Sequence, residues 1–105
     1  MITLQVKEPH SQKVITRLEN GHRLLWPINV FVEFQSGDFG AMYYSARVRG
    51  IPCLLEVTGD IPDQAVRNLS STLVDEFEIY RTAKNPLHPS TKILYESLSE
   101  HIARK

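Results

Sequence analysis

The sequence predicts one α+β domain over residues 1–105, with the element order β-α-β-β-β-α-α and a four-stranded, mostly antiparallel sheet that carries its helices on one face. Three observations predict this class. Apolar residues alternate from Leu24 to Phe34, turn-forming residues follow at two points, and apolar residues recur at helical spacing in the second half. The chain has the usual length of one domain, and its 42% hydrophobic and 23% charged residues are ordinary for a globular protein.

The first two elements are predicted before residue 21. Residues 2–6 alternate between apolar and polar side chains, which is typical of a short strand with one buried face. The apolar side chains that follow have helical spacing: Val14, Ile15 and Leu18. With Gly21 as its end signal, we expect a helix from about 11 to 19. Because a crossover between parallel strands is right-handed, the 2–6 strand is expected parallel to the next strand and beside it.

The strongest signal is the strand from Leu24 to Phe34. Its apolar side chains recur at a spacing of two and therefore share one face: Leu24, Trp26, Ile28, Val30, Val32 and Phe34. Pro27 cannot donate a hydrogen bond to a neighbouring strand. We therefore expect a bulge or bend near the start and a regular strand from Ile28 onward.

Two hairpins are predicted after this strand. A cluster of turn formers would pair Phe34 with Met42. Gly50 suits the first central position of a type II′ turn, which would pair Val48 with Cys53. In these registers the apolar side chains of all three strands lie on one buried face.

Two amphipathic helices complete the predicted fold. Asp60 is expected to cap a helix that reaches Asn85, with proline in its first turn. The apolar stripe of this helix has spacings of three and four: Val66, Leu69, Leu73, Phe77 and Tyr80. Its acidic residues are interpreted as a solvated face: Asp75, Glu76 and Glu78. A last helix is predicted from near Ser90, with a buried stripe formed by Leu94, Leu98 and Ile102.

Charge, the N-terminus and cysteine content limit the partners and the compartment. Twelve Lys and Arg balance twelve Asp and Glu, so no overall basic field attracts nucleic acid. The N-terminus lacks the features of a signal peptide, and no apolar run has the length of a membrane span. The single cysteine, Cys53, excludes an internal disulfide. We expect a cytoplasmic protein that does not contact a membrane.

No residues form a catalytic, cofactor-binding or metal site by their spacing. The four histidines show no metal-binding pattern: His10, His22, His88 and His101. Cys53 alternates with core residues and is expected to be an inert buried thiol. Asp38-Phe39-Gly40 matches a kinase tripeptide, but the other kinase motifs are missing from the sequence. We therefore predict a protein that is not an enzyme and that uses no cofactor or metal.

One group of residues indicates a binding surface. The sheet face opposite the helices is expected to carry the candidate interaction residues Phe31, Tyr43, Arg47 and Leu54. Arg47 would lie diagonal to Phe31, within reach of a stacked guanidinium, and opposite Leu54. Three interpretations stay open: the last helix covers this face, a partner or second copy covers it, or its apolar groups are ordinary scattered surface residues.

Three classes of function follow from these observations. A small non-catalytic protein-interaction or regulatory module, with a protein partner or as a homodimer, is favoured because aromatic residues and arginine dominate interface energetics. An RNA- or ribosome-associated protein is the alternative, because helix-β-β-β-helix is the element order of double-stranded-RNA-binding domains. The long helix begins with Asp60 and Asp63 rather than lysines, which disfavours nucleic acid. An enzyme would need a pairing of nucleophile and base that the sequence does not display.

Overall fold

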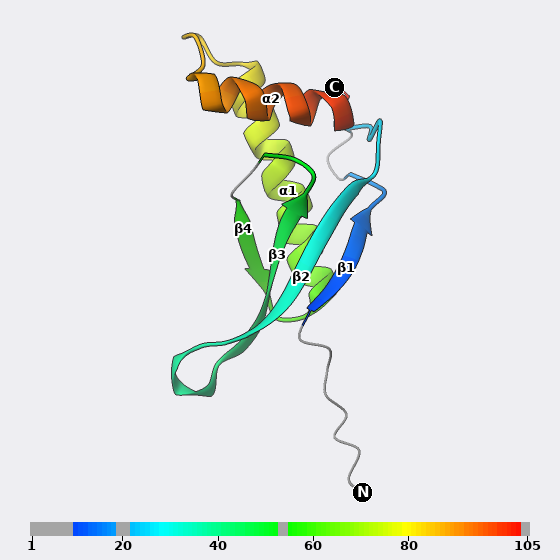
Figure 1. Ribbon diagram of the computed structural model, residues 1–105, viewed down its shortest axis with the longest axis vertical. Coiled ribbons are helices and arrows are strands. Elements are labelled where there is room, and N and C mark those ends of the chain that lie inside the picture. The colour runs from blue at the N-terminus through cyan, green and yellow to red at the C-terminus, as the bar shows by residue number, and fades with distance from the viewer. Residues whose placement is uncertain (1–9, 19–21, 53–54, 104–105) are drawn as a thin grey trace, which may run out of the picture.

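The fold is a four-stranded antiparallel sheet with a long helix on one face and a second helix at one end (Figure 1). The computed structural model describes residues 10–18, 22–52 and 55–103. The elements are β1 (His10–Ile15), β2 (Ile28–Ser36), the 3-10 turn η1 (Asp38–Gly40), β3 (Met42–Arg49), β4 (Glu56–Gly59), α1 (Pro62–Arg81) and α2 (Pro89–His101). The strands are neighbours in the order β1-β2-β3-β4. The predicted α+β class and its four-stranded sheet are confirmed.

β1 lies where a helix over 11–19 was expected. It pairs antiparallel with β2 along its whole length, ending with Ile15 opposite Ile28. Ile15 is buried in the core whereas Val14 is half exposed, as expected for neighbours on opposite faces of a strand. The helix prediction was wrong because three apolar residues at this spacing fit either structure, and main-chain pairing with β2 decides between them.

β1 also takes the place beside β2 that was expected for the strand at 2–6. Residues 2–6 themselves lie outside the described part of the chain. β2 has β1 on one side and β3 on the other, and both pairings are antiparallel. The expected parallel pairing with β2 is therefore wrong.

β2 is regular from Ile28, as the position of Pro27 predicted. Its inward side chains are at most 1% exposed: Ile28, Val30 and Val32. The preceding residues do not belong to the sheet, since Trp26 is 66% exposed and Leu24 forms only an isolated bridge with Ile102, just after α2. The strand predicted from Leu24 therefore begins at Ile28.

Both hairpins pair two residues away from the predicted registers. Phe34 lies opposite Tyr44 rather than Met42, because the short turn η1 lets both strands continue further. The β3–β4 pairing shows the same two-residue shift, and Cys53, predicted opposite Val48, lies outside the described residues. An even shift leaves every side chain on its predicted face.

α1 is shorter at both ends than the predicted helix from Asp60 to Asn85. Ile61 is the N-cap, in an extended conformation that suits a residue before proline, and no side chain caps the helix. Asp60 instead donates its backbone N–H to the side chain of Gln64 at 2.8 Å. The predicted stripe is confirmed: Leu69, Leu73 and Phe77 are buried, and Val66 and Tyr80 pack against them.

α2 packs on α1 at one end of the sheet (Figure 1). The rings of Phe77 and Tyr95 stack there, with their centroids 5.6 Å apart. The end of α2 is also bonded to the chain before β2, because the backbone N–H of Leu25 donates to the carbonyl of His101 at 2.6 Å. These contacts hold α2 beside α1 and the loop that precedes β2.

Candidate functional site

The sheet face turned away from α1 is covered by neither of the described helices (Figure 1). Figure 1 looks onto this face, with α1 behind the strands and α2 beyond one end of the sheet. We call it the outer sheet face, and the register assigns to it Gln12, Val14, Asn29, Phe31, Glu33, Gln35, Tyr43, Ser45, Arg47, Arg49, Glu56 and Thr58. The interpretation that the last helix covers this face is therefore wrong.

Phe31 and Arg47 form a stacked pair near the middle of the outer sheet face. They lie directly opposite each other on β2 and β3, not diagonally as predicted, because of the two-residue shift. The Cζ atom of Arg47 is 4.9 Å from the centroid of the Phe31 ring, which is a cation–π distance. Arg47 also faces Glu56 on β4 rather than Leu54, and Leu54 lies outside the described residues.

Tyr43 lies on the same face of β3 as Arg47, four residues before it in the chain. Ser45 stands between them and is only 5% exposed, although it faces away from the core. Its hydroxyl accepts a hydrogen bond from the side-chain amide of Gln35 at 3.4 Å. The structure thus brings together three of the predicted interaction residues, Phe31, Tyr43 and Arg47, around a polar contact between β2 and β3.

Two further features shape the outer sheet face. Its charged side chains are two glutamates and two arginines, so its formal charge balances: Glu33, Glu56, Arg47 and Arg49. A pocket of about 360 Å³ opens toward one end, lined by Gln12, Asn29, Arg49 and Gly50. The face therefore offers a hollow with amide and guanidinium donors beside the stacked pair.

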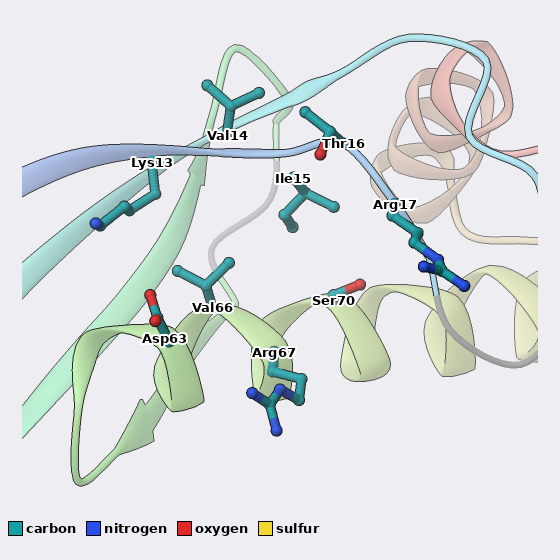
Figure 2. Close-up of a pocket in the computed structure, with 9 residues that line it drawn as sticks. All are labelled: Lys13, Val14, Ile15, Thr16, Arg17, Asp63, Val66, Arg67 and Ser70. Carbon is teal, nitrogen blue, oxygen red and sulfur yellow. The ribbon is translucent and has the colours of Figure 1, made fainter.

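A second pocket, of about 320 Å³, lies on the other side of the sheet between β1 and the first half of α1 (Figure 2). We call it the β1–α1 pocket. Ile15 and Val66 give it apolar walls, Lys13 and Arg17 bring charged groups to its rim, and Ser70 is a buried lining residue. Sequence reasoning missed this pocket because it placed β1 in a helix. The β-branched run Val14-Ile15-Thr16 is a signal that could have suggested a strand there.

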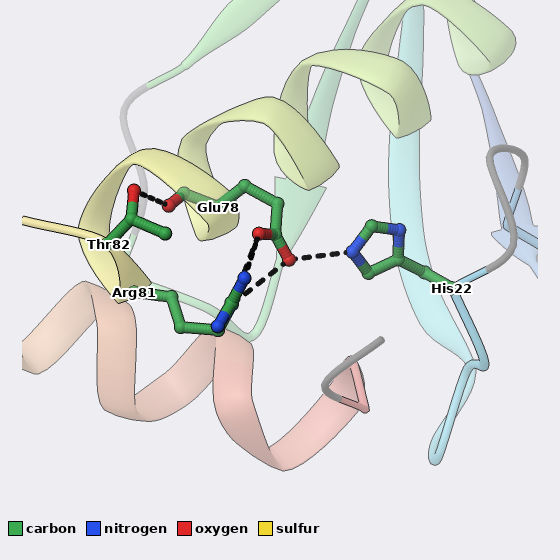
Figure 3. A network of polar contacts seen from close by, with 4 residues as sticks. All are labelled: His22, Glu78, Arg81 and Thr82. Atoms are coloured by element: carbon green, nitrogen blue, oxygen red, sulfur yellow. Dashed lines mark hydrogen bonds and ion pairs between the residues drawn. The ribbon is translucent and has the colours of Figure 1, made fainter.

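A partly buried polar network ties the loop before β2 to α1 (Figure 3). The Nε2 atom of His22 lies 2.8 Å from Oε1 of Glu78, and Arg81 donates to both oxygens of the same carboxylate. Hydrogen bonds from Arg81, and then from His22, lower the pKa of Glu78 from 4.5 to about 2. Asp75 is exposed, as expected of a solvated face, whereas the side chain of Glu78 is only 29% exposed and its carboxylate holds two partners that the sequence did not indicate.

The chemistry available to this network is limited. The ionised Glu78 binds the imidazole and the guanidinium together, and the Nδ1 atom of His22 is buried without a partner among the described residues. A catalytic histidine of the hydrolase type would need a nucleophile on its second nitrogen. We therefore interpret the network as a structural link between distant segments.

Comparison with known proteins gives no match to a family model, a curated protein or a solved structure. Within the described ranges, no three His, Cys, Asp or Glu side chains gather as a metal site would require. The described helices also include none with the length and apolar character needed to cross a membrane.

Proposed function

We propose that this protein is a non-catalytic protein-interaction module that binds a protein partner through its outer sheet face. The observation that carries the proposal is the Phe31–Arg47 stack, at 4.9 Å, on a sheet face that no described helix covers. Interface hot spots are enriched in aromatic residues and arginine. Because the Arg47 guanidinium already contacts the Phe31 ring, we expect its side chain to be partly ordered before binding. Less conformational entropy of this side chain would then be lost when a partner binds.

The charges of the face support a protein rather than a nucleic acid as partner. Glu33 and Glu56 lie among its arginines. A phosphate backbone would meet repulsion at each of these carboxylates. A protein surface can instead present complementary charges to both signs, which favours specificity.

The test compares three forms of the full chain: the wild type, the double variant Y43A/R47E, and the control K84E. Lys84 is exposed in the α1–α2 connection, and its reversal changes the net charge by the same two units as R47E. Each form serves as bait in a lysate of the native host. Proteins retained by the wild type and by K84E, but lost with Y43A/R47E, are identified by mass spectrometry.

The partner found in this way is purified and titrated with each form. We expect Y43A/R47E to bind at least about tenfold more weakly, because losing one hot-spot residue costs about 2 kcal/mol or more and tenfold corresponds to about 1.4 kcal/mol. Sedimentation of the isolated chain shows whether a second copy is that partner. Unchanged capture and sedimentation for Y43A/R47E would refute the proposed face. A salt-dependent RNA gel shift that this variant weakens would replace the protein partner with RNA.

A further inference from the structure

The β1–α1 pocket lies beside β1, the edge strand among the strands that the structure describes. α1 crosses the sheet mainly behind β3 and β4, so the described part of the chain fills the space beneath β1 only partly. On α1, Asp63, Val66 and Ser70 follow one another at spacings of three and four and share one side of the helix. They border the pocket opposite Lys13 and Ile15 of β1 (Figure 2).

Ser70 is the most unusual residue of the pocket. It is 5% exposed, and its Oγ atom is buried without a hydrogen-bond partner among the described residues. A buried hydroxyl without a partner destabilises the folded state, because it gives up its bonds to water. In Figure 2 this hydroxyl points along the helix toward Arg17. An acceptor group placed between Ser70 and Arg17 would receive hydrogen bonds from both side chains.

The remaining charged groups of the pocket are separated. The ends of Lys13 and Asp63 lie at the opposite end from Arg17, and the guanidinium of Arg67 points away from β1 (Figure 2). Ile15 and Val66 form an apolar stretch between the two ends. Its volume of about 320 Å³ is at the lower end of the range for small-ligand sites, which combine apolar walls with few polar groups.

We propose that the β1–α1 pocket binds a small organic anion. Its carboxylate or phosphate group accepts hydrogen bonds from the hydroxyl of Ser70 and the guanidinium of Arg17, and its short apolar body lies against Ile15 and Val66. The pocket is on the helix side of the sheet, whereas the proposed protein-binding face is on the other side. The two proposals therefore fail or succeed independently.

The test uses four probes with the full-length, isotope-labelled protein: hexanoate, hexyl phosphate, 1-hexanol and inorganic phosphate. Titrations are followed by two-dimensional NMR of the backbone amides. We expect at least one of the two hexyl anions to shift the amides of Ile15, Val66 and Ser70 and to bind about tenfold more tightly than 1-hexanol. Comparison of the two anions identifies the preferred head group. Binding no tighter than that of 1-hexanol, or no tighter than that of inorganic phosphate, would overturn the proposal.

Three variants locate the head group. Ser70→Ala and Arg17→Gln should each weaken binding of the anion by about tenfold, since each removes a hydrogen bond to a charged group. Arg67→Gln is the matched control, because it removes the same charge from a lining residue whose guanidinium points away from β1 and from Ser70. Ser70→Ala should also raise the melting temperature of the free protein, because it removes the unpartnered hydroxyl. Equal effects of Arg17→Gln and Arg67→Gln would refute specific recognition and indicate net charge alone.

Discussion

His22 and Glu78 are 56 positions apart in the chain, yet their side chains meet at 2.8 Å. The imidazole is almost fully buried, and its ring lies edge-on to Phe77, with the centroids 6.3 Å apart. Arg81 holds the same carboxylate from the next turn of α1. This contact fixes the loop before β2 against the second half of α1, where α2 also packs.

The lowered pKa of Glu78 should make the stability of the fold depend on acid. Its pKa falls from 4.5 to about 2 through hydrogen bonds from Arg81 and then His22. A depressed folded-state pKa stabilises the protein fully above about pH 5, and the contribution is lost as the pH falls toward 2. Glu78→Gln should therefore lower the melting temperature at pH 7, and the gap to the wild type should narrow between pH 5 and 2. A constant gap in thermal melts would contradict this linkage.

Replacing His22 tests the packing part of the same contact. His22→Ala should reduce the free energy of unfolding by about 1–3 kcal/mol, because it opens a space beside Phe77 and removes one hydrogen bond to Glu78. Urea titration measures the loss. Lys84→Ala, at an exposed position, serves as control and should change the free energy by less than about 0.5 kcal/mol. A loss for His22→Ala as small as that of the control would show that the loop is held by other contacts.

The spacing of apolar residues was enough to predict which face of each strand is buried. That assignment survived a register error at both hairpins, because a shift of two residues returns every side chain to its face. At the β2–β3 hairpin the turn η1 accounts for the error, since strand pairing continues to Ser36 and Met42. Sequence spacing does not specify how tightly a loop closes.

Contacts between distant segments were beyond the reach of the sequence. Nothing local to Glu78 distinguishes it from the exposed Asp75 on the same helix. At 14–18 the apolar spacing fits a helix as well as a strand, and only pairing with β2 selects the strand. The β1–α1 pocket depends on that strand, so it could not be foreseen.

Among the described glycines with a negative φ, Gly59 should be the least replaceable. A Cβ atom on it would lie 2.5 Å from the backbone nitrogen of Ala65 and 2.9 Å from its Cα, so β4 and α1 would have to separate. Gly59→Ala should lower the free energy of unfolding, measured by urea titration, by about 1–3 kcal/mol. Gly37→Ala is the control, because its nearest neighbour is the flexible ring of Tyr43 at 3.4 Å. Equal losses for the two variants would contradict the close approach of β4 to α1.

Phe39 stores backbone strain at the tip of the β2–β3 hairpin. Its φ angle is 60°, in the left-handed region that favours glycine, and its side chain is fully exposed. Phe39→Gly removes the cost of the left-handed backbone, but glycine also gives the unfolded chain more conformational freedom, which offsets part of the gain. The free energy of unfolding should therefore rise by up to about 1 kcal/mol. Chemical denaturation measures the gain. A clear loss of stability would show that the Phe39 ring makes contacts that favour the folded state.

The Phe31–Arg47 stack can be measured in the free protein before any partner is known. A double-mutant cycle with Phe31→Ala and Arg47→Ala should give a coupling energy of about 0.5–1 kcal/mol, the value typical of an exposed cation–π pair. The cycle cancels the other contacts of each side chain. Arg47→Lys retains the charge but loses the planar guanidinium, so it should lose most of the coupling. A coupling near zero would mean that the 4.9 Å contact does not restrain Arg47. The outer sheet face would then present a mobile side chain, and its suitability as a firm binding surface would have to come from Tyr43 and the neighbouring pocket instead.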